Sequence, residues 1–156
     1  AGAKVRVVLA STAQRFRGDS LTNLEIIKRS GINQVCLAGA VAVKWQNALL
    51  SATCLIDAIL GTGATDAARG DSKVAIEAIL GRMKIDPRPR VISIDVPSGF
   101  DCDRGVPCGP CVSANETLTF VASKQGFKTN GAEIYTGRIQ IVDIGVPQVV
   151  RNRFGL

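Results

Sequence analysis

Histidine is absent from this sequence of 156 residues, and aromatic side chains are few, with one Trp and one Tyr. The absence of histidine removes the side chain that most often moves protons near neutral pH. Acid–base chemistry would therefore have to use Asp, Glu, Lys, Cys or Tyr. Because aromatic residues are scarce, the core must consist of Val, Ile, Leu and Ala, which suits buried parallel strands covered by helices on both faces.

Long apolar runs are also absent: none reaches the roughly 18 to 20 residues that a membrane-spanning helix needs. The first residues contain no apolar stretch typical of a secretory leader, so we expect no membrane partner. The net charge is +6, but the basic residues are dispersed, with small clusters only at Arg15/Arg17 and Arg151/Arg153. No aromatic pattern of an RNA-binding sheet accompanies them. We therefore interpret the charge as a solvated basic surface and expect no nucleic-acid partner.

The cysteines number five, an odd count that argues against a fully paired disulfide framework. Cys36 and Cys54 lie in apolar surroundings and are expected to be small core residues. Cys108 and Cys111 form a CxxC motif in a loop rich in Gly and Pro, with Cys102 upstream. This set could be a redox pair or part of a zinc site, although zinc would need a fourth ligand. We expect a reducing compartment: the cytoplasm or, in a eukaryote, an organelle.

Apolar, strand-like runs alternate with segments of helical period along the chain. The expected strands are residues 4–9, 34–37, 53–60, 90–96, 116–121 and 138–144. Helices are expected from residue 19 or 20 to 31, over 41–52, and from 71 or 72 to 83. This order predicts a single α/β domain over residues 1–156, with a Rossmann-like, doubly wound, mostly parallel sheet between two helix layers. Because no helix is evident before the last strand, we expect a mixed or antiparallel edge there.

The first candidate site follows the third expected strand, at Asp57 and the loop Gly61-Thr62-Gly63. Open parallel sheets bind ligands outside the carboxyl ends of their strands. The two glycines allow backbone N–H groups to approach a phosphate closely. Asp57 lies in an apolar strand, where a buried carboxylate needs a cation or several hydrogen-bond donors. The GxG alone is equally consistent with a tight turn, and Asp66 stands where a dinucleotide fingerprint has its third glycine.

The second candidate site follows the fourth expected strand, where Asp95 precedes the turn Val96-Pro97-Ser98-Gly99. A carboxylate at a strand end, before a turn fixed by proline, suits a general acid or base or an anchor for a polar ligand. An aspartate that only caps the turn is the alternative. Lys124, which follows the fifth expected strand, could hold a phosphate as a point charge or be an ordinary surface lysine.

Six motifs follow one another along the chain. They are Asp57-Ala58-Ile59-Leu60-Gly61-Thr62-Gly63, Arg69-Gly70, Ile94-Asp95-Val96-Pro97-Ser98-Gly99, Thr117-Leu118-Thr119-Phe120, Lys124 with Gly126, and Val142-Asp143-Ile144-Gly145-Val146-Pro147. In this order they resemble the YjeF N-terminal domain over essentially the whole sequence. The enzymes of that family are NAD(P)H-hydrate epimerases, isomerases that interconvert the R and S forms of NADHX and NADPHX. The alternative that the resemblance allows is a non-catalytic ligand-binding or protein-interaction module.

The resemblance also implies roles for single residues. Asp57 and Ser98 correspond to ligands of a potassium ion, which prefers oxygen ligands. Asp95 corresponds to the substrate-binding, catalytic carboxylate, and Lys124 is a further expected substrate contact. The loop that contacts the hydrated cofactor corresponds to Gly61, Thr62, Gly63, Ala64, Thr65, Asp66 and Ala67. Expected partners are hydrated NAD(P)H as substrate, a second copy of the chain in a homodimer, and NAD(P)H-hydrate dehydratase as the next enzyme.

Two departures from the family pattern accompany the resemblance. The family domain opens with a strand, an Asn-Asn-Gly-Gly-Asp loop and a helix, which contact phosphate and supply another potassium ligand. Residues 1–5 match the strand after that helix, so we expect an N-terminally incomplete domain. The loop at 64–67 also differs from the family's Leu-Ser-Gly-Glu type, and Asp66 would repel a phosphate unless it meets Arg69. For the reaction we expect loss and return of the C6 hydroxyl through a cation, with proton exchange at Asp95.

Overall fold

The computed structural model describes residues 2–155. Its strands are β1 (Arg6–Leu9), β2 (Asn33–Cys36), β3 (Cys54–Asp57), β4 (Arg90–Ile94), β5 (Phe100–Asp101), β6 (Val106–Pro107), β7 (Glu116–Phe120) and β8 (Arg138–Val142). Its helices are α1 (Gly18–Arg29), α2 (Ala42–Leu49), α3 (Gly70–Arg82), α4 (Glu133–Thr136) and α5 (Gln148–Arg153), with 3-10 turns η1 (Ala13–Arg15) and η2 (Gln125–Lys128). Each strand and helix expected from the sequence is present, several of them shorter than expected.

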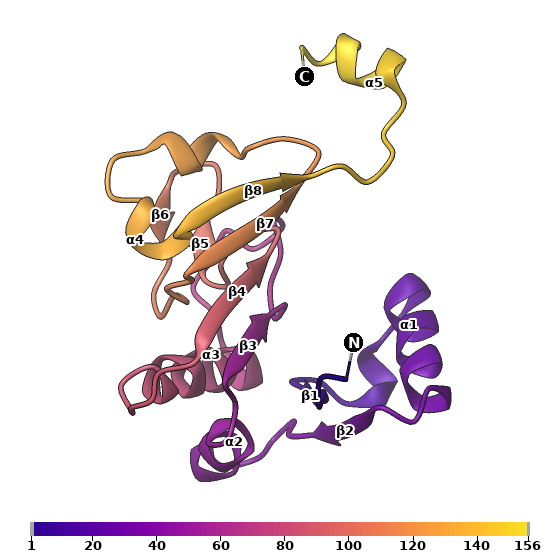
Figure 1. Cartoon of the computed structure of the whole chain (residues 1–156), viewed down its shortest axis with the longest axis vertical. Helices are drawn as coiled ribbons and strands as arrows, with labels where there is room; N and C mark the ends of the chain where they lie inside the picture. The colour runs from indigo at the N-terminus through magenta and orange to yellow at the C-terminus, as the bar shows by residue number, and fades with distance from the viewer. Residues whose placement is uncertain (1, 156) are drawn as a thin grey trace.

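The main sheet has the strand order β3-β4-β7-β8 and is parallel throughout. Strands β1 and β2 form a separate parallel pair, set apart from the main sheet in Figure 1. The predicted α/β fold with a mostly parallel sheet is thereby confirmed. The expected mixed or antiparallel edge is wrong, because β8 runs parallel to β7. The chain returns between these strands through η2 and the four-residue helix α4, which is too short to show a helical period in the sequence.

Helices α2 and α3 form one layer that packs against both sheets. The cluster beside β3 and β4 consists of Leu55, Ala68, Ile76, Ile79, Val91 and Val112. The cluster beside β1 and β2 contains Leu37, Trp45, Ala75 and Ala78, with Val8 and Val35 packed against it. Leu49 and Ile59 contact both clusters. The shared helix layer therefore holds the two sheets together, although no strand pairing joins them within residues 2–155.

The outer strands of both sheets, among them β1 and β3, keep a free hydrogen-bonding edge in the part of the chain that the structure describes. There β1 pairs only with β2, and β3 pairs only with β4. On the side of β3 opposite to Leu55, Ile56 is 58% exposed and Cys54 is exposed. The expectation that Cys36 and Cys54 belong to the core is wrong, since both thiols are exposed. They occupy positions of β2 and β3 that none of the described helices covers.

A third cluster fixes the loops that follow β4. It consists of Val96, Phe100, Cys102, Cys111, Phe127 and Ala132. The ring centroid of Phe100 lies 5.7 Å from that of Tyr135 and 6.1 Å from that of Phe127. This packing anchors the turn after β4 to the η2 segment after β7, and so brings two strand ends together. None of the helices within residues 2–155 combines the length and apolarity that crossing a membrane requires.

Candidate functional site

Asp57, the last residue of β3, is fully buried, and its carboxylate accepts hydrogen bonds on both oxygens. Oδ2 accepts from the Ser93 hydroxyl and from the Ser98 backbone N–H, both at 2.8 Å. Oδ1 accepts from the Ser98 hydroxyl at 2.5 Å and, at 3.4 Å, from the N–H of Ile59. Within residues 2–155 no Lys or Arg forms an ion pair with Asp57. Its negative charge is thus compensated by hydroxyl and N–H dipoles alone.

Several oxygens that could serve as ligands of a hard cation gather around Asp57. The sequence predicts that Asp57 and Ser98 lie together, and their side-chain oxygens are 2.5 Å apart. The Ser98 hydroxyl also accepts from the N–H of Leu60 at 2.9 Å and lies 3.4 Å from the Leu60 carbonyl oxygen. A buried carboxylate without a basic partner is commonly stabilised by a metal ion. Carboxylate, hydroxyl and carbonyl oxygens are the donor set that such a cation prefers.

Asp95 directly follows β4 and has a left-handed backbone, with φ of 68°. This conformation is uncommon for residues other than glycine and often marks a functional position. Its Oδ1 accepts from Lys124 Nζ at 2.8 Å, and from Thr119 Oγ1 and the Phe120 N–H at 3.2 Å each. Partial burial raises the pKa of Asp95, but the hydrogen bonds from Lys124 and Phe120 and the charge of Lys124 outweigh it. The resulting pKa lies below the ordinary value.

Lys124 lies against Asp95, at the carboxyl end of the next strand. Its Nζ also donates to the Phe120 carbonyl oxygen at 3.2 Å, and the side chains of Lys124 and Asp95 are 20% and 23% exposed. Val121, which follows β7 as Asp95 follows β4, likewise has φ of 68°. The two neighbouring strands therefore end with the same unusual backbone conformation, and the partly exposed side chains of Asp95 and Lys124 meet beyond these strand ends.

The predicted substrate loop lines a cavity of about 320 Å³ that extends to the start of α3. Five of the loop residues, from Gly63 to Ala67, line it together with Leu60, Arg69 and Ser72, whereas Gly61 and Thr62 precede it. Arg69 brings positive charge to the wall of the cavity, but it forms no ion pair with Asp66 among the residues described. The Leu60–Ser98 hydrogen bond ties the start of this loop to the Asp57 cluster.

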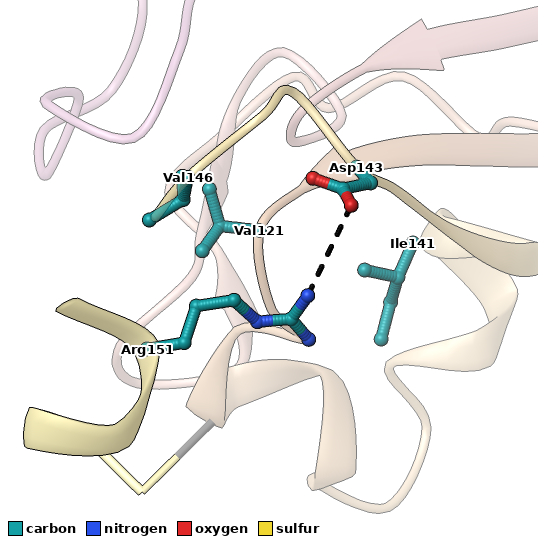
Figure 2. A pocket seen from close by; sticks show the side chains of 5 residues that line it. All are labelled: Val121, Ile141, Asp143, Val146 and Arg151. Atoms are coloured by element: carbon teal, nitrogen blue, oxygen red, sulfur yellow. Dashed lines mark ion pairs between the residues drawn. The ribbon is translucent and has the colours of Figure 1, made fainter. Parts of the chain in front are cut away.

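A second cavity, of about 180 Å³, opens at the carboxyl ends of β7 and β8. It is lined by Val121, Ile141, Asp143, Val146 and Arg151. Figure 2 shows Arg151 reaching from α5 toward Asp143, and the two side chains are 4.0 Å apart. None of these residues was among the predicted site residues, because the small helix α5 that carries Arg151 has no long apolar period.

Two contributors to the site, Ser93 and Thr119, were not predicted from the sequence. Ser93 stands opposite Asp57 in the β3–β4 register and donates to its carboxylate. Thr119 is fully buried in β7 and donates to Asp95. Both are small polar residues at buried positions of their strands, where period-2 alternation places every second side chain on the same face. That alternation was the available signal, but it does not show which carboxylate each hydroxyl contacts.

The cysteines give no support to a zinc or redox site. All five are free, and Cys102 and Cys111 are buried. Burial, followed by the nearby charges of Asp57 and Cys108, raises the pKa of Cys111 to about 12, which opposes formation of the reactive thiolate. Within residues 2–155 no three His, Cys, Asp or Glu side chains are grouped so that they could hold a metal ion.

Curated relatives resemble the chain over most of its length. A NAD(P)H-hydrate epimerase of Pirellula staleyi is 36% identical over 96% of this chain, which spans 64% of that protein. An epimerase of Rhodopirellula baltica is 30% identical over 100% of the chain and 61% of its own length. A bifunctional NAD(P)H-hydrate repair enzyme of Moorella thermoacetica is 36% identical over 94% of the chain, but the chain spans only 27% of it. The chain thus covers less than two thirds of each relative.

A solved structure and a family model also match the chain. A crystal structure of the yeast protein ynu0 superposes on 99% of this chain and 61% of its own, with a TM-score of 0.75 and 19% identity. At that identity the likeness concerns the fold alone. The sequence model of the family described as YjeF-related protein N-terminus matches residues 1–126. This chain therefore belongs to the family of YjeF-related protein N-termini.

Proposed function

We propose that the chain carries the active site of a NAD(P)H-hydrate epimerase, which interconverts the R and S forms of NADHX and NADPHX. The observation that carries the proposal is Asp95, a carboxylate held in a left-handed turn at a strand end with one oxygen open. It lies three residues from Ser98, which contacts the buried Asp57. The names of relatives that are 30% to 36% identical support the same activity.

The loop after β3 is proposed to bind the phosphate-containing part of the substrate. Its cavity is open to solvent beside the first turn of α3, where backbone N–H groups have no helical acceptors. Glycines at 61 and 63 allow close backbone approach, and Arg69 supplies the positive charge that a phosphate attracts. Asp66 lines the same cavity and limits how closely a phosphate can approach that part of the loop.

The reacting ring is proposed to lie over Asp95. In the hydrated nicotinamide, the ring nitrogen can release the hydroxyl on C6, and a planar cation results. Water can then add to either face of C6, which exchanges the R and S forms. An anionic Asp95 placed below the ring would stabilise the developing positive charge, because a preorganised charge in a partly buried site requires little reorganisation.

A potassium ion is proposed to bind at Asp57 and Ser98, where the donor set fits it. When bound, the ion would supply positive charge beside the substrate's phosphates. Ser98 would then turn its hydroxyl proton away from Asp57, toward the Leu60 carbonyl 3.4 Å away, and offer a lone pair instead. We further propose that the protein forms a homodimer in the cytoplasm or an organelle. NAD(P)H-hydrate dehydratase would act as the next enzyme. The bifunctional name of the Moorella thermoacetica relative supports the link to repair.

The proposal is tested by supplying one purified epimer of NADHX and separating the two forms over time. The protein is assayed as this chain and as a chimaera in which residues 1–156 replace the matched region of the Pirellula staleyi epimerase. Equilibration in the chimaera well above the rate without protein is the expected result, with a faster rate in KCl than in NaCl. A folded chimaera that binds NADHX without accelerating equilibration would instead indicate a non-catalytic module.

A further inference from the structure

The two oxygens of Asp95 have different surroundings. Oδ1 accepts all three hydrogen bonds that the structure shows for this side chain, from Lys124, Thr119 and Phe120. Within residues 2–155, Oδ2 accepts none. Since the side chain is 23% exposed, Oδ2 is the oxygen that remains available to a ligand. The three donors on Oδ1 fix its direction before any ligand binds.

The ammonium group of Lys124 likewise keeps one hydrogen-bonding position free. An ammonium group has three N–H donors. One is directed to Asp95 Oδ1 at 2.8 Å and another to the Phe120 carbonyl oxygen at 3.2 Å. The third has no acceptor among residues 2–155, and the side chain is 20% exposed. This partly exposed pair therefore offers one free acceptor, Asp95 Oδ2, next to one free donor, Lys124 Nζ.

We propose that Lys124, and not Asp95, donates the proton to the leaving hydroxyl, while Asp95 stays an anion that faces the positive ring. The inference rests on the proposed epimerase function and assigns the acid of that reaction. As the C6–O bond breaks, its electron pair stays on oxygen, and a proton passes from Lys124 Nζ to this oxygen to form water. After the planar ring has turned its other face toward Lys124, water adds to that face of C6 and its proton goes back to the neutral Lys124 amine, so that atoms and charge balance.

Asp95 itself is a poor proton donor in these surroundings. The bonds from Lys124 and Phe120 keep its pKa below the ordinary value, so at neutral pH its carboxyl carries no proton to give. The hydroxyl that contacts Asp95, Thr119 Oγ1, belongs to a fully buried residue and already donates to the Asp95 carboxylate. No histidine exists in the chain. Among the groups that contact Asp95, Lys124 is thus the one that combines an ionisable proton with a partly exposed side chain.

Lys124→Arg separates proton donation from simple positioning. Arginine keeps the positive charge beside Asp95 but does not give up a proton at neutral pH. The epimerisation rate should fall by about 10²- to 10⁴-fold, the range for loss of a general acid, with KM within about threefold of the parent. Lys128→Arg, at an exposed lysine of η2, is the matched control and should react at the parental rate. A Lys124→Arg rate within about threefold of the parent would overturn the inference.

Chemical rescue gives an independent readout. Lys124→Ala leaves a partly exposed space beside Asp95, so small primary ammonium ions added to the buffer should restore epimerisation. If Lys124 acts as a proton donor, the rate restored by ammonium ions of equal size should increase with the acidity of those ions. Absence of rescue, or rescue independent of acidity, would show that the lysine only positions Asp95. Failure of the parent chimaera to equilibrate the epimers would instead contradict the proposed function, so the two failures are distinguishable.

Discussion

Asp95 is the single residue on which the proposed reaction depends most. Asp95→Asn keeps the shape of the side chain, and asparagine also tolerates the left-handed backbone with φ of 68°. The variant loses the negative charge opposite the ring and the partner of Lys124. Epimer interconversion, followed by separating the two NADHX forms over time, should slow by about 10²- to 10³-fold, the range for loss of one preorganised electrostatic contact, whereas substrate binding should change far less.

Asp103→Asn is the matched control, because Asp103 is exposed and lies in the turn after β5. It should react at the parental rate. If Asp95→Asn also equilibrates the epimers at the parental rate, Asp95 is only a turn cap or a ribose anchor, and the proposed chemistry is wrong.

Ser98 is the residue that links the Asp57 cluster to the substrate loop. Ser98→Ala removes the hydroxyl that donates to Asp57 and accepts from Leu60. Because a buried carboxylate then lacks a donor, the free energy of unfolding should fall by about 1 to 3 kcal/mol, measured by urea denaturation. Ser51→Ala, at an exposed position, should leave it within about 0.5 kcal/mol. Equal effects of the two substitutions would contradict the buried network.

Some contacts of the candidate site could be predicted from the sequence, and others could not. Asp57 and Ser98 could be placed together, because they lie at and after the ends of two strands of a parallel sheet and such strands end at one edge. The contact between Asp95 and Lys124 could not, since it depends on η2 packing against the turn after β4. The exposure of Cys36 and Cys54 could not be predicted either. Apolar neighbours in the sequence indicate a strand, but they do not show whether a helix covers that face of the strand.

Glu116 joins three elements of the main sheet. It begins β7 and accepts from Arg90 of β4 at 2.5 Å and from Arg138 of β8. Burial raises the pKa of Glu116, but the hydrogen bonds and charges of the two arginines outweigh it and keep the pKa below its ordinary value. A carboxyl whose pKa is lowered by folding stabilises the fold above its unfolded pKa, and this contribution is lost as pH falls through the folded pKa.

Glu116→Gln should therefore be less stable than the parent at pH 7, and the difference should shrink as pH falls below about 4, where carboxylates become protonated. Urea unfolding of both proteins across pH 3 to 7 measures it. Glu133→Gln, at an exposed residue of α4, serves as the control. A stability difference that stays constant over this range would show that the ion pairs contribute nothing.

At the scale of elements, the sequence could predict which segments form strands or helices and most of their bounds. It could not predict how the strands pair. The run over 53–60 predicted one strand, whereas β3 ends at Asp57. Its remaining residues form the start of the loop, since Leu60 binds Ser98 instead of a neighbouring strand. Strand β8 is parallel because of a crossover through α4, a helix of four residues. Periodicity detects helices only over longer windows.

Across the whole molecule, the two sheets should differ in local stability. Strand β4 has a partner on both sides, whereas β1 and β2 have only each other within residues 2–155. Two-stranded units are marginally stable without further packing, and here the packing comes from α2 and α3. Amide protons of β1 and β2 should therefore exchange faster than those of β4 and β7, as measured by hydrogen–deuterium exchange with mass spectrometry. Equal protection would show that the shared helix layer makes the molecule one cooperative unit.

The free edges of β1 and β3 have a consequence for the behaviour of the protein at high concentration. Natural sheets protect such edges with lysine, proline or a covering element. Strand β3 has neither of these residues, and Ile56 is 58% exposed beside its free edge. Such a strand is a template on which another chain can add by backbone pairing. Crowding would thus favour self-association through the edge of β3 that is unpaired within residues 2–155.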